Sequence, residues 1–146
     1  MSEIGKPPKH KTTHQNGGAD EIDATGLAGR CDFVDRGDPS AVDFTETSLT
    51  TDGTWRDLDL SAIVGAGAKA VLLSVRITDN QTATEFSFRK NGNSNTINIS
   101  KLNTQVANLP FYLDVIVPLD ANGKIEYMGS NTPFSDISIT VRGWWI

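Results

Sequence analysis

The sequence predicts an all-β fold: an antiparallel β-sandwich of about eight strands, preceded by an extended N-terminal arm. Two observations predict the sandwich. From residue 42 onward, short runs rich in Val, Ile, Phe, Thr and Tyr alternate with Asn, Gly, Asp and Pro every 8 to 12 residues or roughly so. Within several runs the apolar residues occupy every second position, which is the period of a strand. No segment has the period or length of a useful helix.

The N-terminal arm is predicted because the first 40 residues cannot form a core. Their large apolar side chains, beyond Met1, are Ile4, Ile22, Leu27, Phe33 and Val34. A block of lysines at residues 6–11 precedes a block of acids at residues 20–23. We therefore expect residues 1–40 to be an extended segment that docks on another surface, and residues 41–146 to be the head domain. A tail without function is the alternative that remains open.

The expected strands follow the apolar runs in chain order. They are residues 44–50, 54–58, 69–78, 84–90, 96–101, 110–118, 124–129 and 136–145. Alternation predicts that their core face is made of Val71, Leu73, Val75, Ile77, Phe86, Phe88, Ile97, Ile99, Phe111, Leu113, Val115 and Val117. Phe86 and Phe88 lie beside Arg89 and Lys90, but we interpret them as core residues and not as a platform for nucleic-acid bases.

Turn residues separate these strands. Asp52-Gly53, Asn91-Gly92 and Asn122-Gly123 each lie between two apolar runs, where a residue that tolerates positive φ is needed. We expect three hairpins at these positions. Residues 61–68 resemble a helical turn, but Gly65 and Gly67 disfavour a helix, so this segment is predicted to be a loop.

Several large apolar residues fall on the side of their strand opposite the core. Strict alternation places Ile137, Ile139, Val141 and Trp145 on one face of the last strand and Trp144 on the other. Leu72, Tyr112 and Ile116 likewise oppose the core face of their strands. Apolar groups on both faces imply burial on both faces. Either loops or the arm cover these side chains, or they form a subunit interface; we favour a closed homo-oligomer.

Composition and motifs argue against several functional classes. Lys and Arg number 13 against 18 Asp and Glu, a net charge of −5, so a general electrostatic grip on nucleic acid is not expected. No apolar stretch approaches the roughly 18 residues of a membrane span, and no secretory signal is recognised. His10 and His14 alone leave a zinc site incomplete, although a threefold axis would bring three copies of one histidine together. We expect no metal and no cofactor.

No catalytic constellation is recognised either. Both histidines lie in the arm, far in sequence from the sandwich, so a Ser-His-Asp enzyme is not expected. The single cysteine, Cys31, is interpreted as a small packing residue. Carboxylates that glycoside chemistry could use are predicted to be solvated on outward strand positions: Asp57, Asp59, Glu85, Asp114 and Glu126. The chain is therefore predicted not to be an enzyme.

Two segments resemble a known group of proteins. The run His14-Gln-Asn-Gly-Gly-Ala-Asp-Glu-Ile-Asp-Ala-Thr-Gly-Leu-Ala-Gly29 resembles a segment near the N-terminus of phage and prophage virion proteins. The C-terminal half is similar to the trimeric jelly-roll heads of tail fibres and capsid surface proteins, which often end in an aromatic pair as Gly143-Trp144-Trp145 does. The resemblance implies an attachment arm and a projecting trimeric head. The attachment residues would be His14, Gly17, Gly18, Asp20, Glu21, Ile22, Gly26 and Leu27, and the trimer interface Leu72, Tyr112, Ile116 and Trp144.

The resulting hypothesis is a homotrimeric virion protein, made in the host cytoplasm, whose arm docks on the major capsid protein or another virion protein. Residues 30–42 are the only linker, which favours a capsid decoration protein or a short head spike over a long fibre. The alternative is a tail-fibre type of head that binds a host receptor or glycan through loops at residues 79–84, 91–95 and 130–134. It ranks second because Phe134 is the one aromatic residue in these loops.

Overall fold

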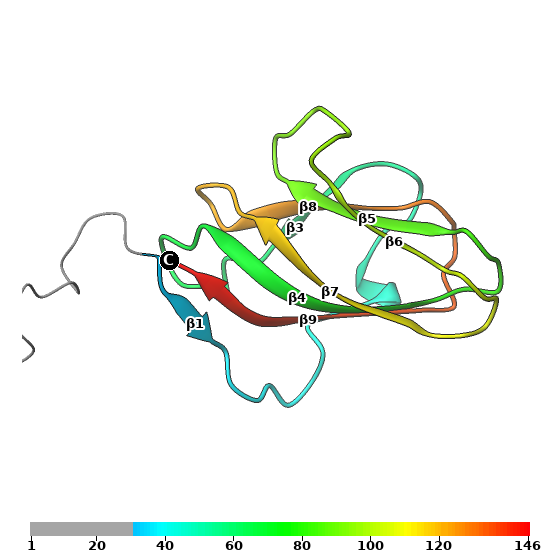
Figure 1. The fold of residues 1–146 in the computed structure, drawn as a ribbon, viewed down its shortest axis with the longest axis horizontal. Coiled ribbons are helices and arrows are strands. Elements are labelled where there is room, and N and C mark those ends of the chain that lie inside the picture. The colour runs from blue at the N-terminus through cyan, green and yellow to red at the C-terminus, as the bar shows by residue number, and fades with distance from the viewer. Residues whose placement is uncertain (1–30) are drawn as a thin grey trace, which may run out of the picture. The chain divides into compact units, whose positions relative to one another are not determined.

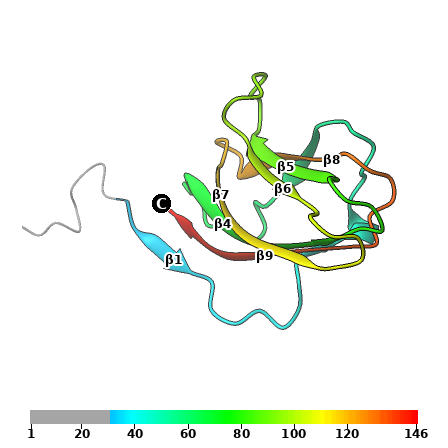
Figure 2. The same cartoon turned by 45° about the vertical axis from the view of Figure 1, so that its right-hand side comes forward.

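The computed structural model describes residues 31–146, which form two antiparallel sheets packed face to face (Figures 1 and 2). Sheet A has the order β1 (Phe33–Asp35), β9 (Asp136–Trp145), β4 (Ala70–Thr78) and β7 (Phe111–Pro118), and β2 (Phe44–Thr45) also pairs with β9. Sheet B has the order β3 (Arg56–Asp59), β8 (Lys124–Gly129), β5 (Glu85–Lys90) and β6 (Ser100–Asn103). A short 3-10 turn, η3 (Glu46–Ser48), follows β2.

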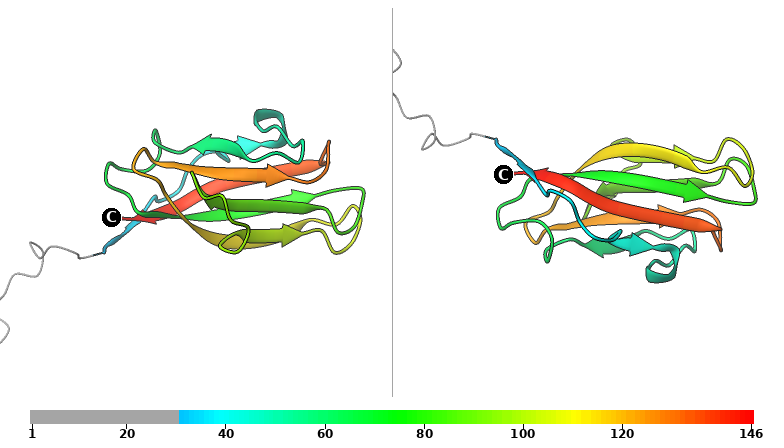
Figure 3. Two further views of the ribbon diagram at one scale, coloured as in Figure 1. Left: turned by 90° about the horizontal axis from the view of Figure 1, so that it is seen from above. Right: turned by 90° about the horizontal axis from the view of Figure 1, so that it is seen from below.

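The strand pairing is that of a jelly roll. β2 pairs with β9, β3 with β8, β4 with β7 and β5 with β6, all antiparallel. The chain from β2 to β9 is thus one long antiparallel hairpin that is rolled into two sheets. This confirms the predicted fold class. Seen from above and below in Figure 3, the strands of the two sheets run in similar directions, as expected of an aligned sandwich.

The core lies between the sheets and is largely the predicted one. Val71, Leu73, Val75 and Ile77 of β4 are at most 1% exposed, and Phe86 and Phe88 of β5 are fully buried. The structural interpretation of the two phenylalanines is therefore confirmed. From the other strands, the core receives Leu102, Val115, Val117, Ile125, Tyr127, Ile137, Ile139 and Val141.

The prediction was wrong for one strand and part of another. Residues 96–99 belong to the long loop between β5 and β6, and Ile97 is 91% exposed. The strand begins at Ser100 instead, and Leu102 fills the inward position. Leu113 is 40% exposed although it occupies an inward position in the alternation of β7, because β7 is the edge strand of sheet A. The run at 44–50 forms only the two residues of β2 before η3 begins.

The glycine turns adopt the predicted backbone, but two of the three are not hairpins. Gly53, Gly92 and Gly123 have φ of +74°, +86° and +75°. Only the turn at Gly92 joins paired strands, β5 and β6; the other two join strands that lie in opposite sheets. A turn sequence specifies the local φ, whereas the partner of each strand depends on the whole fold. Residues 61–68 form turns and no helix, as predicted.

Part of the expected arm is a strand of sheet A. Phe33 is opposite Trp145 in the register of β1 and β9, and Asp32 and Ile146 exchange backbone hydrogen bonds of 3.3 and 3.0 Å. Residues 33–35 are therefore built into the sheet and are not a free segment. The attachment residues between His14 and Leu27 lie outside the described residues, and the division into arm and head stays a prediction.

A β-bulge in β9 changes which tryptophan faces the core. Val141 is opposite Leu73 and Gly143 is opposite Leu72, so Arg142 is an extra residue. One extra residue reverses the alternation of every residue after it. Trp144 consequently lies opposite Val71 and packs against the core, and Trp145 lies on the outer side. The predicted faces of the two tryptophans were therefore wrong, because a strict two-residue alternation assumes a regular strand and does not allow for a bulge.

Substitution of each tryptophan tests this assignment. Trp144→Ala should lower the free energy of unfolding by about 2 to 3 kcal/mol, below the value for a fully buried Trp because the ring is partly exposed. Trp145→Ala should cost about 1 kcal/mol, mainly the ring contact with Phe33. Urea unfolding followed by far-ultraviolet circular dichroism measures both. A larger loss for Trp145→Ala would show that β9 alternates without a bulge.

Candidate functional site

The side of sheet A that faces away from the core is the most distinctive surface of the described residues. We call it the outer face. The strand register gives its residues: Leu72, Ser74 and Arg76 of β4; Tyr112, Asp114 and Ile116 of β7; Ser138, Thr140, Gly143 and Trp145 of β9; and Phe33 of β1. Three of the four predicted interface residues, Leu72, Tyr112 and Ile116, lie on it. The fourth, Trp144, faces the core.

One end of the outer face is apolar. In the register, Leu72 lies between Ile116 and Gly143, and the next row contains Trp145 and Phe33. Ile116 is 57% exposed and Phe33 is 46% exposed. The rings of Phe33 and Trp145 have centroids 4.9 Å apart. The sequence pattern does not identify Phe33 and Trp145 as residues of this face, because their place depends on the pairing of β1 and on the bulge in β9.

Gly143 allows the Phe33 ring to lie across β9. A Cβ atom at Gly143 would come within 2.3 Å of Cζ of Phe33 and 2.5 Å of the backbone oxygen of Val34. Real Cβ atoms do not approach other atoms so closely, so only glycine fits beneath this ring. The apolar end is thus a packed arrangement of β1 on β9. We call Phe33, Leu72, Ile116 and Trp145 the apolar cluster.

The middle of the outer face is a shallow groove floored by hydroxyl groups. Two hollows of 330 and 230 Å³ share Ser74 and Thr140 as lining residues. The first is also lined by Asp35, Gly37, Pro39, Val141 and Arg142, and the second by Val42, Arg76, Tyr112 and Ser138. The groove therefore lies between the segment at residues 35–42 and the edge strand β7.

Both arginines of the outer face form ion pairs. Arg76 lies 2.8 Å from the carboxylate of Asp136 and donates a hydrogen bond of 3.2 Å to Ser138. The pKa of the Arg76 guanidinium is raised, first by the hydrogen bond with the Tyr112 hydroxyl and further by the charge of Asp136, although burial opposes this. Arg142, the extra residue of the bulge, reaches Asp114 at 2.5 Å. Each arginine of this face thus has an aspartate partner.

An ion pair fastens the segment between β1 and β2 to the bulge. Arg36 donates hydrogen bonds from both terminal nitrogens to Asp43, one of them 2.7 Å long. The N–H of Val141 donates to Asp43 at 2.7 Å, and its carbonyl oxygen accepts from Arg36 at 3.1 Å. Neither β1 nor β2 extends to Val141, so these two side chains satisfy backbone groups that a strand would otherwise satisfy.

The outer side of sheet B is different, because polar groups cover it. Arg89 pairs with Glu126, and its guanidinium carbon lies 4.1 Å from the centre of the Trp55 ring. Lys101 lies 3.2 Å from Glu85, which also accepts a hydrogen bond from Ser87. Among the described residues, none of the exposed large apolar side chains belongs to β3, β5, β6 or β8. The exposed apolar surface of the strands is therefore on sheet A.

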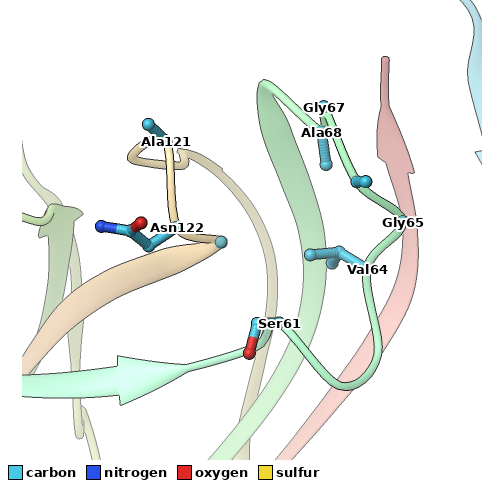
Figure 4. Close-up of a pocket in the computed structure, with 9 residues that line it drawn as sticks. Ser61, Val64, Gly65, Gly67, Ala68, Ala121 and Asn122 are labelled. Carbon is cyan, nitrogen blue, oxygen red and sulfur yellow. The ribbon is translucent and has the colours of Figure 1, made fainter.

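Two further hollows lie at loops. Figure 4 shows one of 290 Å³ between the loop after β3 and the turn before β8, where Ser61 and Asn122 are the polar side chains that line it. Its other lining residues are small or apolar: Val64, Gly65, Ala66, Gly67, Ala68, Ala121 and Gly123. A hollow of 320 Å³ in the β5–β6 loop is lined by Gly92, Asn93, Ser94, Asn95, Ile97 and Asn98. Neither lining contains an acid, a base or a thiol.

The other candidate residues do not assemble into a reactive site. The five carboxylates form ion pairs or hydrogen bonds: Asp57 with Lys124, Asp59 with Ser61, Glu85 with Lys101, Asp114 with Arg142 and Glu126 with Arg89. The hydroxyl and backbone N–H of Ser61 lower the pKa of Asp59. Within residues 31–146, no group of three or more His, Cys, Asp or Glu is arranged to hold a metal ion.

Two single residues also differ from expectation. Cys31 is exposed, so its interpretation as a packing residue was wrong. Phe134, the one aromatic residue of the three candidate ligand loops, is only 4% exposed and stacks edge-on against Phe86 at 5.8 Å. It is therefore part of the core and not a platform for a sugar. His10 and His14 lie outside the described residues.

Comparison with solved structures gives a loose likeness to a viral coat protein. No family model matches the chain, and no curated protein matches it. Among solved structures, the coat protein of Tobacco streak virus superposes with a TM-score of 0.36 at 13% identity, over 82% of this chain and 85% of that chain. A superposition this loose leaves the function to be argued from the chain's own residues. In residues 31–146, no helix is long and apolar enough to span a membrane.

The ion pair beneath the bulge gives a stability prediction. Asp43→Ala should lower the free energy of unfolding by about 3 kcal/mol, because it leaves Arg36 and the N–H of Val141 without an acceptor in a largely buried site. Asp43→Asn keeps an acceptor oxygen and should cost less than half as much. Urea unfolding of both variants is the measurement. Equal, small losses would mean that solvent satisfies Val141 and that the pair does not fasten the segment.

Proposed function

We propose that this chain is a structural virion protein whose jelly-roll head assembles as a homotrimer and whose N-terminal arm attaches it to the particle. The observation that carries the proposal is the outer face of sheet A. It exposes an apolar cluster in a sandwich whose other outer side is covered by paired polar groups. A large apolar patch with a polar rim is typical of a surface that another protein covers.

The resemblance of the sequence supports the rest of the proposal. The segment from His14 to Gly29 supports attachment to the major capsid protein or another virion protein, and the number three for the trimer rests on the same resemblance. β1 begins at Phe33, so few residues separate the attachment segment from the head. This favours a capsid decoration protein or a short head spike. The proposal assigns no catalytic step, cofactor or metal to the chain.

Trimer formation would strengthen attachment without any additional contact. When one arm of an oligomer is bound, the other arms are held near their sites, and each later contact is effectively intramolecular. A weak arm therefore suffices if three copies act together. In this proposal, self-assembly through the head and binding through the arm are two parts of one function.

Recognition of a host receptor or glycan is the second candidate function. The observation that favours it is the β5–β6 loop, where the amides of Asn93, Asn95 and Asn98 line a hollow beside the exposed side chain of Ile97. Amides donate and accept hydrogen bonds, as the hydroxyls of a neutral sugar require. Binding to a glycan array that is lost on Asn95→Ala would favour this candidate.

Removal of residues 1–30 tests the assignment of roles. Residues 31–146 form a compact unit, so the truncated chain should stay folded. It should no longer bind particles that lack the protein. A deletion to residue 40 is unsuitable as a test, because it would also remove β1 and Arg36. Particle binding by co-sedimentation, with circular dichroism as the folding control, is the measurement. Undiminished decoration by the truncated head would contradict the proposal.

The kind of interaction that holds the arm on the particle gives a separate prediction. Exposed ion pairs contribute only about 0 to 1 kcal/mol each and weaken with salt. Burial of an Ile or Leu side chain contributes about 1.5 to 3 kcal/mol and hardly responds to salt. Ile22→Ala or Leu27→Ala should therefore weaken particle binding more than Lys9→Ala does, in low and in high salt. If high salt alone released the wild-type protein and the two apolar substitutions had little effect, the arm would be held by charge.

A further inference from the structure

We infer that the apolar cluster of the outer face, Phe33, Leu72, Ile116 and Trp145, contacts a second copy of this chain, and that the copies therefore meet at the point where their N-terminal segments leave the head. This inference rests on the proposed function, because it specifies the surface through which the homo-oligomer forms. It also adds a consequence: assembly brings the Cys31 residues of the copies together.

The size of the outer face suits a protein partner. β4 has nine residues, and a rise of about 3.3 Å per residue gives a length of about 30 Å. Four strands at about 4.8 Å spacing give a width of about 19 Å. The flat area is therefore about 570 Å² before side chains add to it, comparable with the roughly 800 Å² that each partner contributes to a stable interface. A small ligand would leave most of this face uncovered.

The charges of the outer face favour a second copy as the partner. The whole chain carries a net charge of −5, which makes unspecific contact between copies unfavourable. On this face, however, Arg76 pairs with Asp136 and Arg142 pairs with Asp114. These pairs leave Asp35, whose carboxylate accepts a hydrogen bond from the N–H of Gly37, as the acid of this face without a cationic partner within residues 31–146, so a copy of the same face meets little net repulsion. A strongly charged partner would meet no large patch of opposite charge on this face.

The side chains at the apolar cluster are of the types that stabilise interfaces. Trp, Tyr and Arg are enriched among residues that contribute most to protein binding. Trp145 lies in the cluster, Tyr112 lies on the same face, and Arg142 lines its groove and pairs there with Asp114. The Phe33 ring is already held over Gly143 by close packing, so little conformational freedom is lost when a partner covers it. Ile146 at the C-terminus is 44% exposed.

The path of the chain connects this surface to the arm. The backbone of Asp32 pairs with that of Ile146, one residue before Phe33 enters the apolar cluster. Cys31, the residue before Asp32, is exposed and is the single cysteine of the chain. Copies that meet through the apolar cluster must therefore bring their Cys31 thiols close together. The cysteine is here a reporter of the geometry and has no proposed role of its own.

Cross-linking of the full-length protein tests the inference. A trifunctional maleimide with short arms is added to the reduced protein at micromolar concentration, and the products are separated on a denaturing gel. Covalent species of three times the 15.8 kDa chain mass are expected. Ile116→Asp places a charge in the apolar cluster and should reduce the cross-linked fraction at least tenfold, with a fall of the sedimentation mass to that of one chain. Circular dichroism shows whether the variant is folded.

Three further variants distinguish an effect on the contact between copies from an effect on the cross-linking reaction itself. Ile97→Asp makes the same change at a residue that is 91% exposed in a loop of sheet B, and it should leave the cross-linking and the mass unchanged. Cys31→Ser should abolish cross-linking and leave the mass of the oligomer unchanged. Trp145→Ala, a neutral truncation of the apolar cluster, should also shift the mass toward a single chain. This variant keeps the inference testable if Ile116→Asp fails to fold.

Other outcomes would overturn the inference in distinguishable ways. An oligomer that forms normally but does not cross-link would mean that the copies meet through another surface. If the wild-type protein were a monomer that still decorates particles, the contact between copies would be disproved but the virion role would not. Another protein would then cover the outer face. If the wild-type oligomer cross-linked but bound no particle, the proposed contact between copies would be supported and the virion role would be contradicted.

Discussion

The structure depends on how β9 pairs along its length. This strand pairs with β4 on one side and with β1 and β2 on the other, so it joins the start and the end of the described chain in one sheet. Its bulge at Arg142 reverses the alternation of the last residues. Trp144 then closes the core and Trp145 becomes part of the surface. A regular strand would instead turn Trp145 toward the core and Trp144 toward the outer side.

The bulge lies beside the groove of the outer face. β1 pairs with residues 143–145 of β9 and β2 with residues 138–139, and the ion pair of Arg36 and Asp43 satisfies the backbone of Val141 between them. The segment between the two short strands is thereby held beside the outer face. Arg142, the extra residue, is free to reach across to Asp114. Arg142, the one inserted residue, thus contributes both to the lining of the groove and to one of the two ion pairs of the outer face.

The two outer sides of the sandwich suggest how the molecule works. Sheet B presents paired charges and the Trp55 ring over Arg89, a surface that is stable in water. Sheet A presents the apolar cluster, whose exposure is costly in an isolated molecule. We propose that one side faces solvent and the other faces further copies.

The sequence by itself determined the all-β sandwich class, most strand positions, the positive φ of three glycines and the core faces of β4 and β5, because these follow from short-range periodicity. It also indicated Leu72, Tyr112 and Ile116 as outward apolar residues. The positions of Trp144, Trp145 and Phe33, and the partners of the strands that flank the turns at Gly53 and Gly123, were decided only by the tertiary structure. A bulge and a crossover between sheets depend on register across distant strands, which no local pattern contains.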